Sequence, residues 1–142
     1  MAPIRCAPTP GELFVMRVAG NVVSPDLLAS IEYGVQFLGT PLIMVLGHSS
    51  CGAVDAAIKV LKTSAELPGH LRDLIAAIKP AVIVAERTQQ GSLIVNAVAE
   101  NVRGQVARLQ ASPPVVQSYY RAKKVDIVGA VYDLATGKIA LV

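Results

Sequence analysis

Short apolar runs alternate along the chain with longer segments in which apolar residues recur at helical spacing. Runs bounded by Gly, Pro or Asn are typical of buried strands, whereas the helical spacing is typical of amphipathic helices. The pattern predicts strands at 13–18, 41–47, 125–132 and 139–142. It predicts helices at 24–39 and 53–61, from 68 to near 80, at 92–110, and in a short segment through Tyr119 and Tyr120.

Two details of this pattern bear on the tertiary structure. The run 41–47 is apolar throughout, so it is expected to be covered on both faces, as strands of a parallel sheet are. The helix that opens at Pro68-Gly69 is expected to end near Lys79-Pro80, because proline interrupts helices, with a further apolar segment at 82–85. The alternation of strands and helices predicts an α/β fold in one domain, 1–142, with an irregular segment at 1–10.

The composition excludes several classes of protein. The 142 residues are 53% hydrophobic and 16% charged, which suits a folded domain with a core and excludes a disordered chain. Every apolar run is interrupted before the ~20 residues of a membrane-spanning helix, so no membrane segment is expected. The 13 basic and 10 acidic side chains form no basic stripe interleaved with aromatic residues, so nucleic-acid binding is not expected.

The cysteines and the N-terminal residues indicate the compartment. Cys6 and Cys51 are too few for a disulfide framework and suit a reducing compartment or a metal. The first residues lack the apolar stretch of a signal peptide. A cytoplasmic location is therefore expected.

The strongest candidate for chemistry is His48-Ser49-Ser50-Cys51, which directly follows a predicted strand and precedes a predicted helix. Zinc accepts imidazole nitrogen and thiolate sulfur, and this spacing across a strand-to-helix turn lets both side chains face one ion. Two other interpretations stay open. Cys51 would act as a nucleophile with His48 as its base, or it would be a core cysteine beside a turn histidine.

Other residues receive mainly structural interpretations. We expect Met44 in the strand core, Tyr119 and Tyr120 in packing, Glu86-Arg87 at a solvated helix end, and His70 in the first turn of a helix. Gly20, Gly47 and Gly52 are expected to allow tight turns. Arg17 and Asn21 are expected to make structural hydrogen bonds, with shaping of the site or of a dimer interface as the alternative.

Several segments along the chain together form a recognisable pattern: Arg17 to Asn21, Ser30 to Tyr33, Gly39 to Val54, Asn101 to Val106, Ser112-Pro113 and Val128 to Gly137. In content and order they resemble segments of the β-class carbonic anhydrases. The resemblance extends from about Gly11 to Val142 and implies an α/β fold with a parallel sheet flanked by helices. It also implies zinc-dependent, reversible hydration of carbon dioxide to bicarbonate, with a zinc ion held by two cysteines and one histidine. By this resemblance, His48 and Cys51 are two of the three ligands.

The chain departs from the family pattern on its N-terminal side. The family's C-x-D-S-R motif, which carries the other cysteine ligand and a catalytic Asp–Arg pair, does not occur, and no Asp precedes Asp26. Cys6 is followed by Ala-Pro-Thr-Pro and is expected to be an ordinary thiol rather than the missing ligand. We therefore expect weak zinc binding and a chain that is impaired or inactive in carbon dioxide hydration.

The same departure affects the sheet. Without the family's N-terminal helices and the strand that carries this motif, two interior sheet edges are left open, so a homo-oligomer or a rearranged sheet is expected. Two alternative functions stay open. One is a non-catalytic protein that pairs with a full-length subunit through these edges. The other is a carbonyl sulfide or carbon disulfide hydrolase of the same family.

Overall fold

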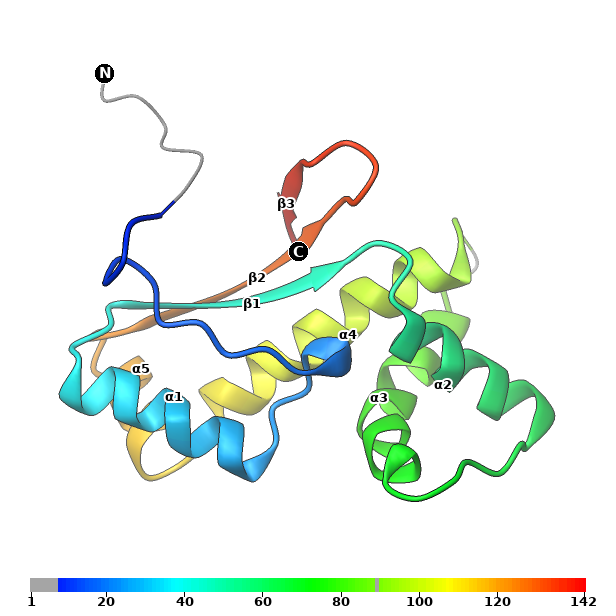
Figure 1. The fold of residues 1–142 in the computed structure, drawn as a ribbon, viewed down its shortest axis with the longest axis horizontal. Helices are drawn as coiled ribbons and strands as arrows, with labels where there is room; N and C mark the ends of the chain where they lie inside the picture. Colours follow the sequence, from blue (N-terminus) through cyan, green and yellow to red (C-terminus); the bar gives the residue numbers. More distant parts are fainter. Residues whose placement is uncertain (1–7, 89) are drawn as a thin grey trace.

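The computed structural model describes residues 8–88 and 90–142, in which helices and strands follow largely the predicted order (Figure 1). The helices are α1 (Pro25–Phe37), α2 (Gly52–Thr63), α3 (Leu71–Glu86), α4 (Leu93–Gln110) and α5 (Val115–Arg121). The strands are β1 (Leu42–His48), β2 (Asp126–Tyr132) and β3 (Ile139–Leu141), and a 3-10 turn, η1, covers Ala19–Asn21. No helix within these residues is long and apolar enough to cross a membrane.

The described sheet has the order β1-β2-β3. β1 and β2 are parallel, in a register that runs from Leu42 opposite Asp126 to His48 opposite Tyr132. The chain between these two strands contains α2 to α5, in keeping with the long crossover that parallel strands require. β3 returns antiparallel to β2. The fold is thus α/β with a parallel strand pair packed against helices, as predicted.

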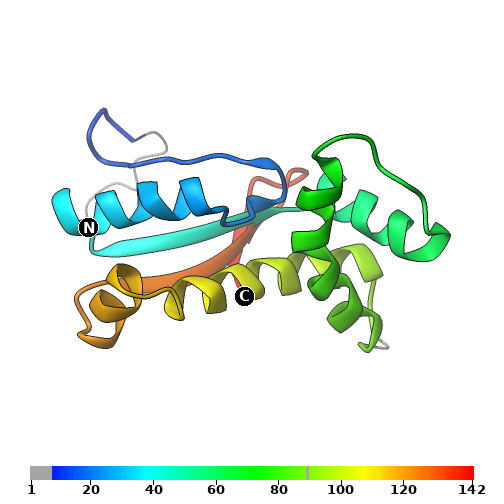
Figure 2. The same cartoon turned by 90° about the horizontal axis from the view of Figure 1, so that it is seen from below.

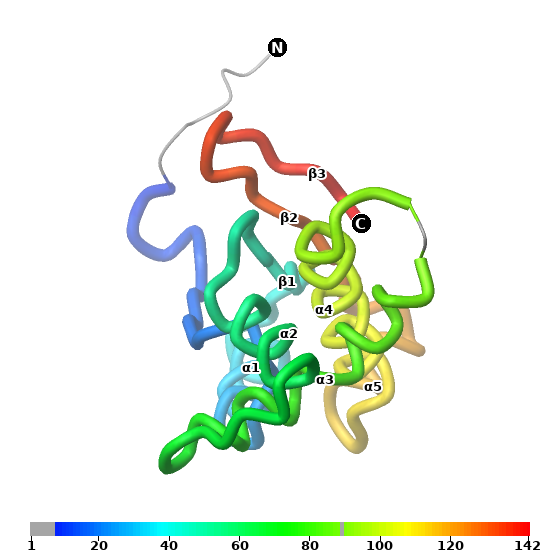
Figure 3. Tube along the Cα trace, turned by 90° about the vertical axis from the view of Figure 1, so that its right-hand side faces the viewer, coloured from blue at the N-terminus to red at the C-terminus, as the bar shows by residue number. Residues whose placement is uncertain are grey.

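Helix α4 packs closely against the parallel pair because each strand has a glycine at the contact. A Cβ built on Gly47 would lie 2.6 Å from Val102 Cγ2, and one built on Gly129 would lie 2.7 Å from Val102 Cγ1. Val102 itself is fully buried. The helices lie on one side of the β1–β2 pair (Figures 1 and 3).

The expectation that the strand at 41–47 is covered on both faces is wrong. Val45 is 7% exposed on the face toward the helices, whereas Leu42, Met44 and Leu46 are 47%, 44% and 44% exposed on the opposite face. Met44 is therefore not a core residue. Since successive side chains of a strand point to opposite faces, helices on one side alone leave every second residue of β1 uncovered.

The expected strand at 13–18 is also wrong, although the segment keeps strand-like side-chain alternation. Its residues are not assigned to any strand. Phe14 approaches α1, where a Cβ built on Gly34 would lie 3.0 Å from the Phe14 ring, and Met16 packs against the core. Leu13 and Val15 are 63% and 64% exposed. A strand needs a hydrogen-bonded neighbour, and the described residues supply none for this segment.

Helix α3 does not end near Lys79-Pro80 as expected but continues through Pro80 to Glu86. Pro80 and Ala76, whose carbonyl the missing Pro80 N–H would have bonded, are both exposed, so water can solvate that carbonyl. The buried residues of α3 lie before and after the proline: Ile75, Ile78, Ala81, Val82 and Ala85. Packing of this apolar face outweighs the local cost of the proline.

Candidate functional site

His48 and Cys51 lie where β1 passes into α2. His48 is the last residue of β1 and is exposed, and the next residue, Ser49, donates its backbone N–H to the carbonyl of Tyr132 at 2.9 Å. Ser50 has a φ of 55°, which turns the chain, and Cys51 is the N-cap residue of α2. The sequence therefore places both side chains on one strand-to-helix turn, as predicted.

The imidazole of His48 is oriented by its own loop. Nδ1 lies 2.9 Å from the backbone carbonyl oxygen of Ser49. A carbonyl oxygen can only accept, so Nδ1 carries the proton in this contact. In that tautomer the free electron pair lies on Nε2, which can bind a metal ion.

Cys51 has a different environment. It is 3% exposed and belongs to the core cluster that includes Val22, Val54 and Ala97. It is a free cysteine at the first turn of α2. The thiol thus has the chemistry of a zinc ligand and the surroundings of a core residue.

The turn that begins at Asp133 holds the loop from the other side, through contacts with Ser49 that the sequence analysis missed. Ser49 Oγ accepts the Leu134 N–H at 2.9 Å and donates to Asp133 Oδ1 at 3.5 Å. Asp133 Oδ1 also accepts the Ala135 N–H at 2.9 Å, and Oδ2 accepts from the Thr136 hydroxyl at 2.8 Å. These donors, the Ala135 N–H foremost and then the Thr136 hydroxyl, lower the pKa of Asp133.

Only the tertiary structure reveals that this turn meets Ser49, because 84 residues separate Ser49 from Asp133. The sequence signal for the turn itself is the Asp133-to-Gly137 segment, in which Asp and Thr side chains bond nearby backbone groups.

Two polar residues of α4, also missed from the sequence, support the segment that precedes α1. Asn101 Nδ2 donates to the Gly20 carbonyl at 2.7 Å, and Gln105 Oε1 accepts the Val23 N–H at 2.9 Å. Both side chains are buried. The sequence signal that could have revealed them is a pair of amide side chains four residues apart on an apolar helix face. Buried amide side chains need hydrogen-bond partners, and backbone groups without partners in a ladder or helix supply them.

Asn21 lies beside the site, whereas Arg17 does not contribute to it. Asn21 Oδ1 would be 3.4 Å from a Cβ built on Gly47, the residue before His48, and Asn21 Nδ2 is buried without a partner among the described residues. Arg17 is exposed and makes no hydrogen bond or ion pair in the described part of the chain, so its expected structural hydrogen bond is absent there.

Of the glycines expected in tight turns, Gly20 has the positive φ of 67° that the expectation implies. The expectation is wrong for Gly47, which permits close packing within β1, and for Gly52, which begins α2.

The remaining predicted residues lie elsewhere in structural roles. His70 is the N-cap of α3, with a fully exposed side chain 3.6 Å from Asp73. Tyr119 and Tyr120 are half-buried against the core, which confirms packing, and Glu86 and Arg87 form an exposed end of α3.

Zinc takes three or four protein ligands, and the described residues do not supply that number. No group of three or more His, Cys, Asp or Glu side chains able to hold a metal ion occurs among residues 8–88 and 90–142. Cys6 lies outside the described residues. His48 and Cys51 therefore have suitable donor atoms for zinc, but the donor set is incomplete in the described part.

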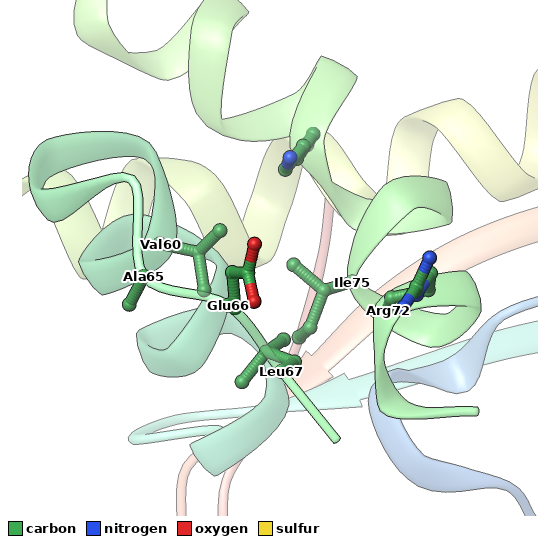
Figure 4. Close-up of a pocket in the computed structure, with 7 residues that line it drawn as sticks. Val60, Ala65, Glu66, Leu67, Arg72 and Ile75 are labelled. Carbon is green, nitrogen blue, oxygen red and sulfur yellow. The ribbon is translucent and has the colours of Figure 1, made fainter. Parts of the chain in front are cut away.

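A shallow pocket of about 200 Å³ lies away from these residues, between α2, α3 and the loop that joins them (Figure 4). Apolar Val60, Leu67 and Ile75 line it together with Glu66 and Arg72 (Figure 4). It contains neither His48 nor Cys51, so it is not a candidate substrate site for their chemistry.

Comparison with known proteins agrees with the fold. Residues 3–139 match the family model described as carbonic anhydrase. A carbonic anhydrase from Mycolicibacterium smegmatis is 37% identical over 131 residues, which are 92% of this chain and 63% of that relative. This chain thus spans less than two thirds of that relative's length.

Solved structures give the same result. The β-carbonic anhydrase CcaA superposes with a TM-score of 0.79 at 29% identity, over 94% of this chain and 68% of that chain. A β-carbonic anhydrase from Coccomyxa, solved with acetazolamide, gives a TM-score of 0.77 at 30% identity, over 94% of this chain and 62% of that chain. With the family model matched over nearly the whole chain and the sheet and helices superposed on these enzymes, the chain belongs to the β-carbonic anhydrase family.

Proposed function

We propose that this chain serves the reversible, zinc-dependent hydration of carbon dioxide to bicarbonate, with His48 and Cys51 as two of the zinc ligands. The observation that carries the proposal is the match to the family model over residues 3–139, with both donors on the turn between β1 and α2. The free Nε2 implied by the Ser49 contact supports a ligand role for His48.

The isolated chain is proposed to be a poor catalyst. Two donors hold zinc weakly compared with the three or four of ordinary protein sites, and the described residues bring no third donor to His48 and Cys51. The Asp–Arg pair that the family resemblance implies is also missing from the sequence. Low zinc occupancy and slow hydration are expected together.

Zinc stoichiometry and carbon dioxide hydration by the same preparation test this proposal. The purified chain in micromolar zinc is expected to hold well below one ion per chain and to hydrate carbon dioxide little faster than buffer. His48→Ala is expected to abolish the residual zinc binding. His70→Ala, which removes an exposed histidine outside the turn, is the control and is expected to have no effect.

Two outcomes would contradict this proposal. One tightly held zinc per chain and rapid hydration would show that the site is complete, and Cys6→Ser would then show whether Cys6 supplies the third ligand. If His70→Ala lowered zinc binding as much as His48→Ala, the assignment of His48 would be wrong.

Carbon dioxide and bicarbonate are the proposed substrates, in preference to carbonyl sulfide or carbon disulfide, because the matched family model and relatives are described as carbonic anhydrases. A cytoplasmic homo-oligomer is proposed on the free, buried Cys51 and on the uncovered apolar face of β1. That face also favours a second candidate function, a non-catalytic subunit that pairs with another chain.

A further inference from the structure

The pocket shown in Figure 4 is enclosed by the loop between α2 and α3. Ser64 ends α2 with a φ of 53°, and Gly69 turns the chain toward α3 with a φ of 54°. The loop therefore folds back against both helices and leaves a pocket of about 200 Å³. Pockets for drug-sized ligands measure roughly 300–1,000 Å³, so a ligand that fits here must be small.

The floor of this pocket is apolar. Ile75 of α3 is 3% exposed and belongs to the core cluster. Val60 from the last turn of α2 and Leu67 from the loop are partly buried and pack against the same cluster. Because the floor is part of the core, it is held in place before any ligand binds, and it offers burial to an aliphatic group.

Three charged side chains surround this apolar floor. Arg72 and Lys79 lie three residues before and four residues after Ile75, which places all three on one face of α3. Glu66 comes from the loop, and Figure 4 shows Glu66 and Arg72 on opposite sides of Ile75. None of the three charged side chains makes an ion pair or hydrogen bond with another described residue. Charges of both signs are thus available to a ligand.

This arrangement of charges selects the class of ligand. A simple carboxylate would pair with the cations of α3 but would be repelled by Glu66, and a simple amine would be repelled by Arg72 and Lys79. A zwitterion pairs with both signs at once. A free α-amino acid has its carboxylate and its ammonium group on one carbon, and its side chain is then left to contact the apolar floor.

We propose that this pocket binds a free apolar α-amino acid of about the size of leucine. Arg72 and Lys79 hold its carboxylate, Glu66 holds its ammonium group, and its side chain packs on Val60 and Ile75. The pocket contains neither of the proposed zinc ligands, so the proposal stands independently of the proposed function.

Titration of the full, isotope-labelled chain with L-leucine, followed by amide NMR, tests the proposal. Saturable shifts of amides within 60–79 are expected, with a Kd of about 1 mM because the pocket is small and open. Two matched probes each lack one charge: 4-methylpentanoate has no ammonium group, and 3-methylbutylamine has no carboxylate. Each is expected to bind at least tenfold more weakly than L-leucine.

Two variants then assign the charges. Glu66→Gln and Arg72→Gln alter exposed side chains, so both are expected to fold, and each is expected to weaken L-leucine binding at least tenfold. Glu66→Gln is also expected to bind 4-methylpentanoate at least as tightly as the unmodified chain does, because the repelling carboxylate is gone. Arg87→Gln removes an exposed cation of α3 outside the pocket and is expected to change nothing.

Contrary results overturn defined parts of the proposal. The absence of saturation up to about 20 mM L-leucine, or shifts only outside 60–79, overturns the site. Equal binding of L-leucine and 4-methylpentanoate overturns the choice of a zwitterion. Unchanged L-leucine binding in Glu66→Gln or Arg72→Gln, or equal weakening in Arg87→Gln, overturns the assignment of the charged partners.

Discussion

Gly47 shows how strongly single residues constrain this site. A Cβ built there would lie 2.6 Å from Val102 Cγ2, a fully buried side chain that also contacts Gly129. Gly47→Ala is therefore expected to destabilise the chain by about 1–3 kcal/mol through overpacking. Urea unfolding followed by circular dichroism measures this change.

Gly104→Ala is the matched control for that prediction. Gly104 lies inside α4, and a Cβ built there would meet nothing within 4 Å. Because alanine favours helix over glycine by up to about 1 kcal/mol, this variant is expected to be stabilised. Destabilisation by both substitutions, or by neither, would contradict the packing argument at Gly47.

The ionisation of Asp133 makes the stability of the turn next to Ser49 depend on pH. The Ala135 N–H and the Thr136 hydroxyl favour the ionised carboxylate, so the pKa of Asp133 lies below its usual value. A lowered pKa adds stability that is present above the usual pKa of aspartate, about 3.9, and is lost as the pH falls through the lowered folded value. The turn next to Ser49 is thus expected to loosen only in acid.

Titration of the Asp133 carboxyl carbon by NMR measures that pKa. Thr136→Val keeps the side-chain shape but removes one donor and is expected to raise the pKa of Asp133 toward its usual value. A pKa that is already ordinary in the unmodified chain would contradict the assignment of these hydrogen bonds.

At the scale of elements, α3 contains a proline that packing tolerates. Pro80→Ala restores a backbone donor to the exposed Ala76 carbonyl without altering the buried face of α3. The substitution is expected to stabilise the chain by about 1–2 kcal/mol. Proline in a helix interior costs about 3 kcal/mol, and part of this cost is offset because proline also restricts the conformations of the unfolded chain. Thermal unfolding measures the gain. A lower midpoint would mean that Pro80 makes a packing contact which outweighs the lost hydrogen bond.

At the scale of the whole molecule, the sheet has helices on one side and an apolar face on the other. Leu42, Met44 and Leu46 are each more than 40% exposed there. Concentration-dependent self-association at micromolar protein is expected in sedimentation velocity, and Met44→Lys is expected to weaken it at least tenfold. Ile83→Lys places the same charge on α3 at a residue of similar exposure and is expected to change nothing. A chain that stays monomeric at all concentrations would contradict this prediction.

The helices and the central strands could be predicted because their signals are local. Ser24 accepts a hydrogen bond from Leu27 as an N-cap, and the apolar run before His48 forms β1 as expected. The placement of His48 and Cys51 on one turn followed from their spacing between a strand and a helix. Periodicity, caps and short spacings depend on neighbours within a few residues, so the sequence determined them without the fold.

What the tertiary structure decided depends on distant partners. Residues 13–18 have the composition of a strand. They do not form one, because the described chain brings no backbone to pair with them. β1 is apolar throughout, but only the position of the helices decides which of its faces is buried. The same holds for the contact between Ser49 and Asp133. The sequence determined which residues can form strands and bind a metal, and the assembled fold decided which of them have partners, since pairing and burial depend on elements far away in the chain.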